Sequence, residues 1–165
     1  MEEEVKHKIG FDEKGNVVLK EKKKVAMGAK SRASGAAFEL RVRKDLEEKG
    51  WTVDKWTNNI DLEKNEIISA KRKMRFINQN MRFMALGTGF PDFVAFQLMD
   101  GGGNYRVIGV EVKMNGKLSR VEKEKCRWYL ERKTFNEIWI AKKIKEKNRV
   151  RVEYSEISLK VTIEE

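Results

Sequence analysis

Two apolar runs joined by a glycine-rich break constrain the fold of this 165-residue chain more than any other feature. Residues 92–98 and 105–113 are rich in Val, Ile, Phe and Tyr, and the break between them contains Asp100-Gly-Gly-Gly-Asn104. Runs of β-branched and aromatic residues on either side of such a turn are typical of a β-hairpin. The sequence therefore predicts an antiparallel pair of strands.

The register of this hairpin decides which polar side chains meet. If Leu98 pairs with Tyr105, Asp92 falls opposite Glu111, and their Cβ atoms lie roughly 5 Å apart on one face. Side chains alternate along a strand, so Lys113 shares that face while the neighbouring valines point the other way. A slip of one residue would separate the two carboxylates.

Two carboxylates held this close repel one another unless a cation neutralises them. Carboxylate oxygens suit Mg²⁺ or Mn²⁺, which take their other ligands from water and phosphate. The metal can polarise a phosphoryl oxygen, and a nearby lysine can orient water or stabilise developing charge. The predicted chemistry is metal-assisted hydrolysis of a phosphodiester.

The alternative is a surface hairpin whose edge carries ordinary ion pairs. Glu-x-Lys recurs at Glu21, Glu47 and Glu131 in this chain, in which 38% of residues are charged. Only the copy at Glu111 lies inside an apolar strand and follows a Pro-Asp pair by the length of a hairpin.

Pro91-Asp92 followed by Glu111-Val112-Lys113 resembles the signature of the PD-(D/E)XK nuclease superfamily. Residues 115–119 and the helix expected after them resemble the archaeal Holliday junction resolvase and VRR-NUC branches, and residues 34–53 resemble the first helix of those enzymes. The similarity spans residues 31–142. It implies an α/β fold with a restriction-endonuclease-like core, in which a mixed central β-sheet is flanked by helices.

The resemblance also implies the roles of individual residues. Asp92 and Glu111 would be the central metal ligands, with the backbone carbonyl of Val112 nearby, and Glu39 would be a further acidic ligand. Lys113 would be the catalytic lysine, and Thr88 would lie near the scissile phosphate. The cofactor would be Mg²⁺, with Mn²⁺ as a substitute, and symmetric cutting of junctions implies a homodimer.

Two departures from the family pattern leave substrate preference open. Glu122 stands where VRR-NUC proteins tend to have a glutamine, and residues 57–86 are longer and more basic than the loop typical of cellular resolvases. We predict an Mg²⁺-dependent endodeoxyribonuclease acting on branched DNA. The alternatives are a duplex, nick or flap nuclease of the same superfamily and a non-catalytic basic DNA-binding module.

The length and patterning of the chain favour one domain. We expect a basic arm or hairpin over residues 1–30, the nuclease core over 31–142, and a β tail of the same domain over 143–165 that extends the sheet or pairs with a second subunit. A helix capped by Ser31 or Ser34 should run to about Lys49, and its buried stripe should comprise Phe38, Val42 and Leu46. Ser119 should cap a second helix that ends near Lys133.

The chain has a formal net charge of +10, which favours a polyanionic partner such as DNA. Cations mixed with aromatic and amide side chains can grip phosphates and touch bases. The alternative is a solvated, charge-rich surface. The predicted DNA contacts are Lys30, Arg32, Lys71, Arg72, Lys73, Arg75, Phe76 and Arg82.

Other classes lack the necessary residues. His7 is the only histidine. The chain therefore lacks the residues for a catalytic triad that uses histidine and for a zinc site with histidine ligands. No apolar run reaches the length of a membrane span. The lone cysteine, Cys126, fits an intracellular, cytoplasmic protein.

Overall fold

The structure, a computed structural model, describes residues 6–12, 14–70, 72–76, 81–86, 89–99, 103–147 and 149–157; for 72–75 and 82–86 it describes the backbone alone. The chain forms two compact units. The ribbon unit comprises residues 1–37 and 70–87, and the sheet unit comprises residues 38–69 and 88–165.

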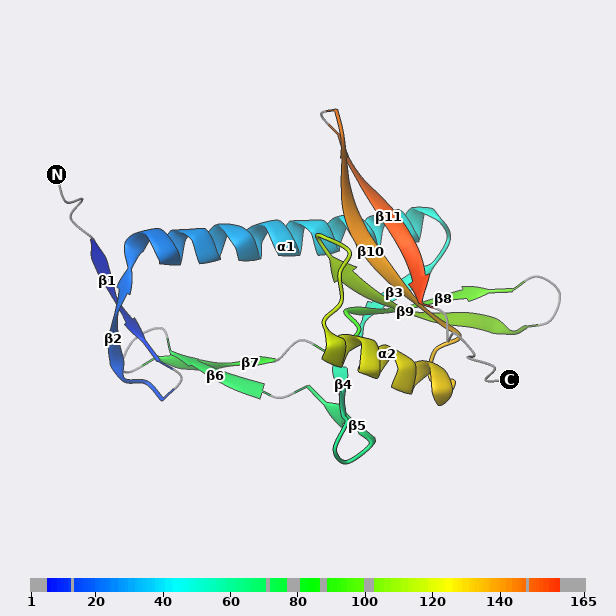
Figure 1. Ribbon diagram of the computed structural model, residues 1–165, viewed down its shortest axis with the longest axis horizontal. Coiled ribbons are helices and arrows are strands. Elements are labelled where there is room, and N and C mark those ends of the chain that lie inside the picture. The colour runs from blue at the N-terminus through cyan, green and yellow to red at the C-terminus, as the bar shows by residue number, and fades with distance from the viewer. Residues whose placement is uncertain are drawn as a thin grey trace, which may run out of the picture. The chain divides into compact units, whose positions relative to one another are not determined.

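The sheet unit is built on a mixed five-stranded sheet with the order β11-β10-β9-β8-β3 (Figure 1). Strands β9 and β10 are parallel, and all other neighbours are antiparallel. The predicted α/β class with a mixed central sheet is therefore confirmed. The strands are β3 (Thr52–Lys55), β8 (Phe93–Leu98), β9 (Tyr105–Lys113), β10 (Glu137–Glu146) and β11 (Arg149–Ile157).

The predicted hairpin is confirmed, and its register is the one in which Asp92 falls opposite Glu111. Leu98 pairs with Tyr105 at one end of the β8–β9 ladder, and Phe93 pairs with Val110 at the other. Asp92 directly precedes this ladder, so the same register carries it to the level of Glu111.

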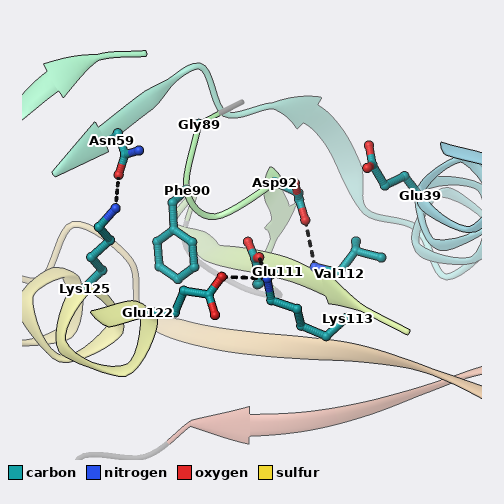
Figure 2. A pocket seen from close by; sticks show the side chains of 10 residues that line it. All are labelled: Glu39, Asn59, Gly89, Phe90, Asp92, Glu111, Val112, Lys113, Glu122 and Lys125. Atoms are coloured by element: carbon teal, nitrogen blue, oxygen red, sulfur yellow. Dashed lines mark hydrogen bonds and ion pairs between the residues drawn. The ribbon is translucent and has the colours of Figure 1, made fainter. Parts of the chain in front are cut away.

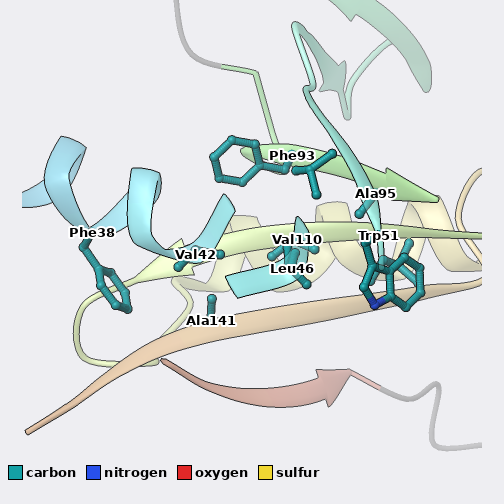
Figure 3. Close-up of a cluster of buried hydrophobic side chains, with 10 residues drawn as sticks. Phe38, Val42, Leu46, Trp51, Phe93, Ala95, Val110 and Ala141 are labelled. Atoms are coloured by element: carbon teal, nitrogen blue, oxygen red, sulfur yellow. The ribbon is translucent and has the colours of Figure 1, made fainter. Parts of the chain in front are cut away.

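Alternation along the strands gives the sheet two apolar faces. On β9, Ile108 and Val110 belong to one buried cluster, whereas Val107 packs against a second cluster. The first cluster includes the C-terminal part of helix α1 (Lys22–Glu48), and the second includes helix α2 (Arg120–Glu131). Figure 3 shows the first cluster, in which the predicted helical stripe meets the strands through Phe38, Val42, Leu46, Phe93, Ala95, Val110 and Ala141.

The start predicted for the first helix is wrong. Helix α1 begins at Lys22 and not at Ser31 or Ser34, while its end at Glu48 agrees with the prediction. Lys, Ala and Met dominate residues 22–30 and favour a helix, with no proline to stop it. The residues expected to form a basic arm are therefore the first turns of α1.

Helix α2 begins as predicted. Ser119 caps it in a reciprocal capping box, in which the Ser119 side chain accepts from the Glu122 backbone and the Glu122 side chain accepts from the Ser119 backbone. After α2, β10 returns parallel to β9, and β11 pairs antiparallel with β10. The tail as far as Ile157 thus extends the sheet, which was one of the two predicted arrangements.

A short hairpin that was not predicted from the sequence completes the sheet unit. Its strands are β4 (Asn58–Asp61) and β5 (Glu66–Ser69), and Asn65 in the turn has a φ of 59°. Trp128 Nε1 donates to Asn65 Oδ1 at 2.6 Å, which ties the hairpin to α2.

The ribbon unit contains the N-terminal part of α1 and two antiparallel hairpins. The predicted N-terminal hairpin is confirmed as β1 (His7–Phe11) and β2 (Val17–Glu21), whose turn is held by the Asp12 carboxylate. The second hairpin is β6 (Arg72–Phe76) and β7 (Arg82–Leu86). A Cβ added at Gly15 would lie 3.0 Å from the Phe76 ring, so this aromatic side chain packs at the turn of the first hairpin.

The positive charge of the chain is concentrated in the ribbon unit. Residues 22–37 and 70–87 contain no Asp or Glu. The number of their cations equals the formal net charge of +10; these residues are Lys22, Lys23, Lys24, Lys30, Arg32, Lys71, Arg72, Lys73, Arg75 and Arg82.

Neither of the helices that the structure describes is long and apolar enough to cross a membrane.

Candidate active site

A pocket of about 370 Å³ opens in the sheet unit where β8 begins and β9 ends (Figure 2). It brings together most of the site that the sequence predicted and adds residues from α2 and β4. Its lining consists of Glu39, Asn59, Gly89, Phe90, Asp92, Glu111, Val112, Lys113, Glu122 and Lys125.

Asp92 is held by two backbone N–H groups, one on β9 and one directly after β3. Its Oδ2 accepts a hydrogen bond from the Val112 N–H at 2.9 Å, and its carbonyl accepts from the Trp56 N–H at 3.1 Å. The chain reaches this position by passing close to the backbone near β4. A Cβ added at Gly89 would lie 1.9 Å from the Trp56 carbonyl oxygen, so only glycine fits there.

Glu111 is buried with one oxygen unsatisfied. The residue is 5% exposed, and its Oε1 lies 2.9 Å from Lys113 Nζ. Its Oε2 has no hydrogen-bond partner among the residues that the structure describes. A buried anionic oxygen without a partner is costly, and such atoms are rare in folded proteins. This oxygen therefore marks a position where a cation would be stabilising.

The pKa values of the two carboxyl groups respond to this environment. Burial, followed by repulsion from Asp92, raises the pKa of Glu111 to about 7. Burial also raises the pKa of Asp92, against the lowering effect of the Val112 N–H, and the negative charge of Glu39 adds to the rise. Both shifts have the direction expected of acidic groups that lack a neutralising ion.

Lys113 lies between two carboxylates. Its Nζ is 2.9 Å from Glu111 Oε1 and 2.6 Å from Glu122 Oε1. Partial burial acts to lower its pKa, but the hydrogen bonds and charges of Glu122 and Glu111 outweigh burial and raise the pKa. The Lys113 side chain is therefore protonated at neutral pH and fixed in position by two ion pairs.

Glu122 has two structural connections. One oxygen accepts from Lys113, and the other accepts from the Ser119 N–H at 2.7 Å. Burial is the largest single influence and acts to raise the pKa of Glu122, but the hydrogen bonds from Lys113 and Ser119 and the charge of Lys113 together outweigh it and lower the pKa. The N-cap of α2 thereby fixes the position of the lysine.

Glu39 projects from α1 into the same pocket, beyond Asp92 (Figure 2). Its carboxylate is half-buried and lies 2.6 Å from Lys55 Nζ. The structure thus brings all three predicted acidic residues to one pocket, with Glu39 paired to a lysine of β3.

The donor set fits a hard divalent cation. Among the described residues, no group of three or more His, Cys, Asp and Glu side chains is already arranged to hold a metal ion. Mg²⁺, however, is bound through one or two carboxylates, with water and phosphate supplying the remaining ligands. Asp92 and the unpartnered Oε2 of Glu111 meet that requirement.

Other predicted site residues fall elsewhere. Thr88 and Lys71 lie outside the described residues. Lys30 and Arg32 are exposed on α1, and Phe76 is half-buried at the end of β6. The remaining predicted DNA contacts belong to the second hairpin of the ribbon unit: Arg72, Lys73 and Arg75 lie in β6, and Arg82 lies in β7.

Asn59, Phe90 and Lys125 were not predicted from the sequence as site residues. Nothing in the local pattern around Asn59 or Lys125 separates them from surface residues. Glu122 was noted only as a departure from the family pattern, although the spacing Ser119-x-x-Glu122 is a capping-box signal that fixes its position.

No protein-family model matches this chain, and neither the curated proteins nor the solved structures include one that matches it.

Proposed function

We propose that the protein is a metal-dependent endodeoxyribonuclease with a restriction-endonuclease-like core. The observation that carries the proposal is the buried, unpartnered Oε2 of Glu111, held beside Asp92 and the cationic Lys113 in one pocket. A mixed sheet flanked by helices, with Asp92 directly before β8 and Glu111 on the adjacent β9, also agrees with the arrangement expected from the sequence resemblance.

Asp92 and Glu111 would hold Mg²⁺, with the Val112 carbonyl nearby and Glu39 contributing directly or through water. When bound, the ion polarises the phosphoryl oxygen and makes water a stronger nucleophile. In the hydrolysis, the water oxygen bonds to phosphorus, the ester bond to one deoxyribose breaks, and a proton passes from the water to the departing oxygen.

Lys113 acts in this scheme as a cation. Because its pKa is raised, it is a poor acceptor for the proton of water. It instead donates hydrogen bonds that orient the water or stabilise negative charge on the phosphoryl oxygens. Glu122 would keep Lys113 in place if Glu111 held the metal.

The charge distribution supports a nucleic-acid substrate. The cations of residues 22–37 and 70–87 supply the whole formal excess of +10, whereas the pocket itself is acidic. Basic segments bind the phosphate backbone without reading its sequence. We assign branched DNA as the preferred substrate, with cleavage by a homodimer.

Cleavage of labelled substrates tests the proposal. Wild type, Asp92→Asn and Lys113→Ala are compared on a four-way junction, a flap, a nicked duplex, a plain duplex and a single strand, each with Mg²⁺ and with EDTA. Glu124→Gln and Lys123→Ala serve as controls for loss of charge, because both residues lie on α2 and outside the pocket. We expect cleavage of the junction by wild type and both controls, and a decrease of at least about 100-fold in both site variants.

The other outcomes separate the alternatives. Cleavage of flaps or plain duplex with the same mutational losses would keep the chemistry and remove the junction assignment. If no substrate is cut while all variants bind DNA equally, the protein is a non-catalytic binding module. Activity in Asp92→Asn equal to that of wild type would move the active site away from this pocket.

A further inference from the structure

A second basic group lies in the same pocket, across Phe90 from the carboxylates (Figure 2). Lys125 of α2 is half-buried, and its Nζ donates to Asn59 Oδ1 at 2.7 Å. The ammonium also lies 5.6 Å from the centroid of the Phe90 ring. Lys125 thus points along one wall of the pocket while Lys113 occupies the other.

The two lysines differ in how their charge is balanced. Lys113 has two carboxylates within 3 Å, whereas Lys125 has no carboxylate within 4.0 Å among the described residues. A neutral amide oxygen is a weaker partner for an ammonium than an anionic oxygen is. Lys125 is therefore a half-buried cation whose charge no carboxylate of the described residues neutralises.

Asn59 is held so that it can offer donors beside this cation. Its Oδ1 accepts from both Lys125 and the backbone N–H of Ile60, the latter at 2.8 Å. Its Nδ2 has no partner among the residues that the structure describes, and Figure 2 shows this nitrogen on the side of Phe90. An ammonium and an amide N–H₂ side by side are suitable donors for the oxygens of one phosphate.

Phe90 forms a fixed spacer between this pair and the carboxylates. Its side chain is buried, its N–H donates to the Asn58 carbonyl at 2.9 Å, and its own carbonyl accepts from the Tyr129 hydroxyl at 2.9 Å. The pocket therefore presents an acidic site on one side of an aromatic ring and an unneutralised cation on the other.

We infer that Lys125 and Asn59 form a binding subsite for the phosphodiester next to the one that is hydrolysed. The inference rests on the proposed nuclease function. A strand whose scissile phosphate lies at Asp92 and Glu111 passes Phe90 with its sugar and places its neighbouring phosphate at Lys125. Phosphate contacts of this kind fix the register of the strand and carry no base specificity.

DNA binding in EDTA tests the subsite without any cleavage. Lys125→Gln removes the charge and keeps a hydrogen-bonding amide, and Lys123→Gln removes the same charge from an exposed position two residues away on α2. In Lys125→Gln we expect the slope of log affinity against log salt to become shallower by about 0.7 to 0.9, which is the contribution of a single neutralised phosphate. Lys123→Gln should keep the wild-type slope, and Lys125→Arg should restore it. Equal slopes for Lys125→Gln and wild type, or the same change in both Gln variants, would overturn the inference.

A chemical substitution in the DNA locates the phosphate that Lys125 binds. A neutral methylphosphonate is placed in turn at each of the two linkages that flank the cleavage site. One of the two should weaken binding by wild type several-fold and have little further effect on Lys125→Gln, because that variant no longer binds the charge of this phosphate. If the methylphosphonate weakens binding by Lys125→Gln as much as it weakens binding by wild type, the inference is overturned.

These results are separable from a failure of the proposed function. If Asp92→Asn is inactive while Lys125→Gln behaves as Lys123→Gln does, the nuclease remains and the subsite is wrong. If Asp92→Asn retains full activity, the proposed active site is wrong, whatever the salt slopes show. Thermal unfolding of each variant checks that it is folded.

Discussion

At the scale of single residues, the site depends on a carboxylate charge that the described residues compensate only in part. Glu111 is buried beside Asp92, and only one of its oxygens has a partner in the described structure. Lys113 compensates part of the charge and is itself shared with Glu122. Such an arrangement lowers the stability of the metal-free protein and is expected where a ligand supplies the missing charge.

The stability of the metal-free protein should depend on pH through Glu111. Its pKa is raised from the ordinary value of 4.5 to about 7, so the folded protein binds the proton more tightly than the unfolded chain. The stabilisation from this protonation is fully present below pH 4.5 and is lost as the pH rises through about 7. The loss should be on the order of 3 kcal/mol for an otherwise isolated group.

Urea unfolding in EDTA, from pH 4.5 up to about pH 8, measures this effect. Glu111→Gln removes the titrating group. The free energy of unfolding of wild type should therefore decrease relative to that of Glu111→Gln as the pH rises. If the proposed site binds Mg²⁺ through its ionised carboxylates, Mg²⁺ should recover the stability of wild type at the alkaline end and leave Glu111→Gln nearly unchanged. Parallel pH profiles of unfolding free energy for the two proteins would show that Glu111 is not the group that makes stability depend on pH.

At the scale of elements, the segment 89–92 connects the pocket to the sheet by close backbone packing. The glycine at position 89 lies against the backbone at Trp56 and Asn58, and the chain then enters β8 with Asp92 held by β9. The geometry of the site thus depends on how closely this segment can approach the backbone near β4.

Gly89→Ala should therefore destabilise the sheet unit severely. Its Cβ would lie 1.9 Å from the Trp56 carbonyl oxygen and 2.7 Å from the Asn58 carbonyl oxygen, and backbone cannot yield as a flexible side chain does. We expect a decrease of about 3 kcal/mol or more in unfolding free energy, at the upper end for overpacking.

The matched control is Gly35→Ala in helix α1. A Cβ at Gly35 meets nothing within 4 Å, so alanine should stabilise the helix by about 0.5 to 1 kcal/mol. Denaturant unfolding of the two variants should give changes of opposite sign. A Gly89→Ala protein as stable as wild type would mean that this segment is free to move away from β4.

At the scale of the whole molecule, the basic segments and the acidic pocket belong to different units. The acidic pocket lies in the sheet unit, whereas residues 22–37 and 70–87 of the ribbon unit hold cations without any Asp or Glu. Affinity for a polyanion and cleavage of it should therefore respond to different substitutions.

Two variants with the same net charge test this division. Both lower the formal charge from +10 to +5 by changing five cations to glutamine. The first changes Lys71, Arg72, Lys73, Arg75 and Arg82; the second changes the sheet-unit residues Lys44, Lys64, Lys117, Lys123 and Lys145. The first should bind DNA more weakly, and its salt dependence should be shallower by about 0.9 for each duplex phosphate that it no longer neutralises.

The second variant should bind DNA nearly as wild type does. Both variants should keep the stabilisation by Mg²⁺, because neither alters a residue that lines the pocket. Equal decreases of affinity in the two would mean that net charge alone, and not its position in the ribbon unit, governs binding.

The sequence by itself determined the elements whose signals are local. Alternation and a glycine-rich turn predicted the β8–β9 hairpin, and the register considered for it, which brings Asp92 to the level of Glu111, is the one that the structure has. Ser119 marked the start of α2. Each of these depends on residues close together along the chain, where side-chain period and capping chemistry suffice.

The tertiary structure alone decided the remainder. No local pattern predicted the β4–β5 hairpin, nor that Asn59 and Lys125, 66 residues apart, share a hydrogen bond on one pocket wall. Interactions between segments so distant in sequence are set by how helices and strands pack together, which the local sequence does not encode.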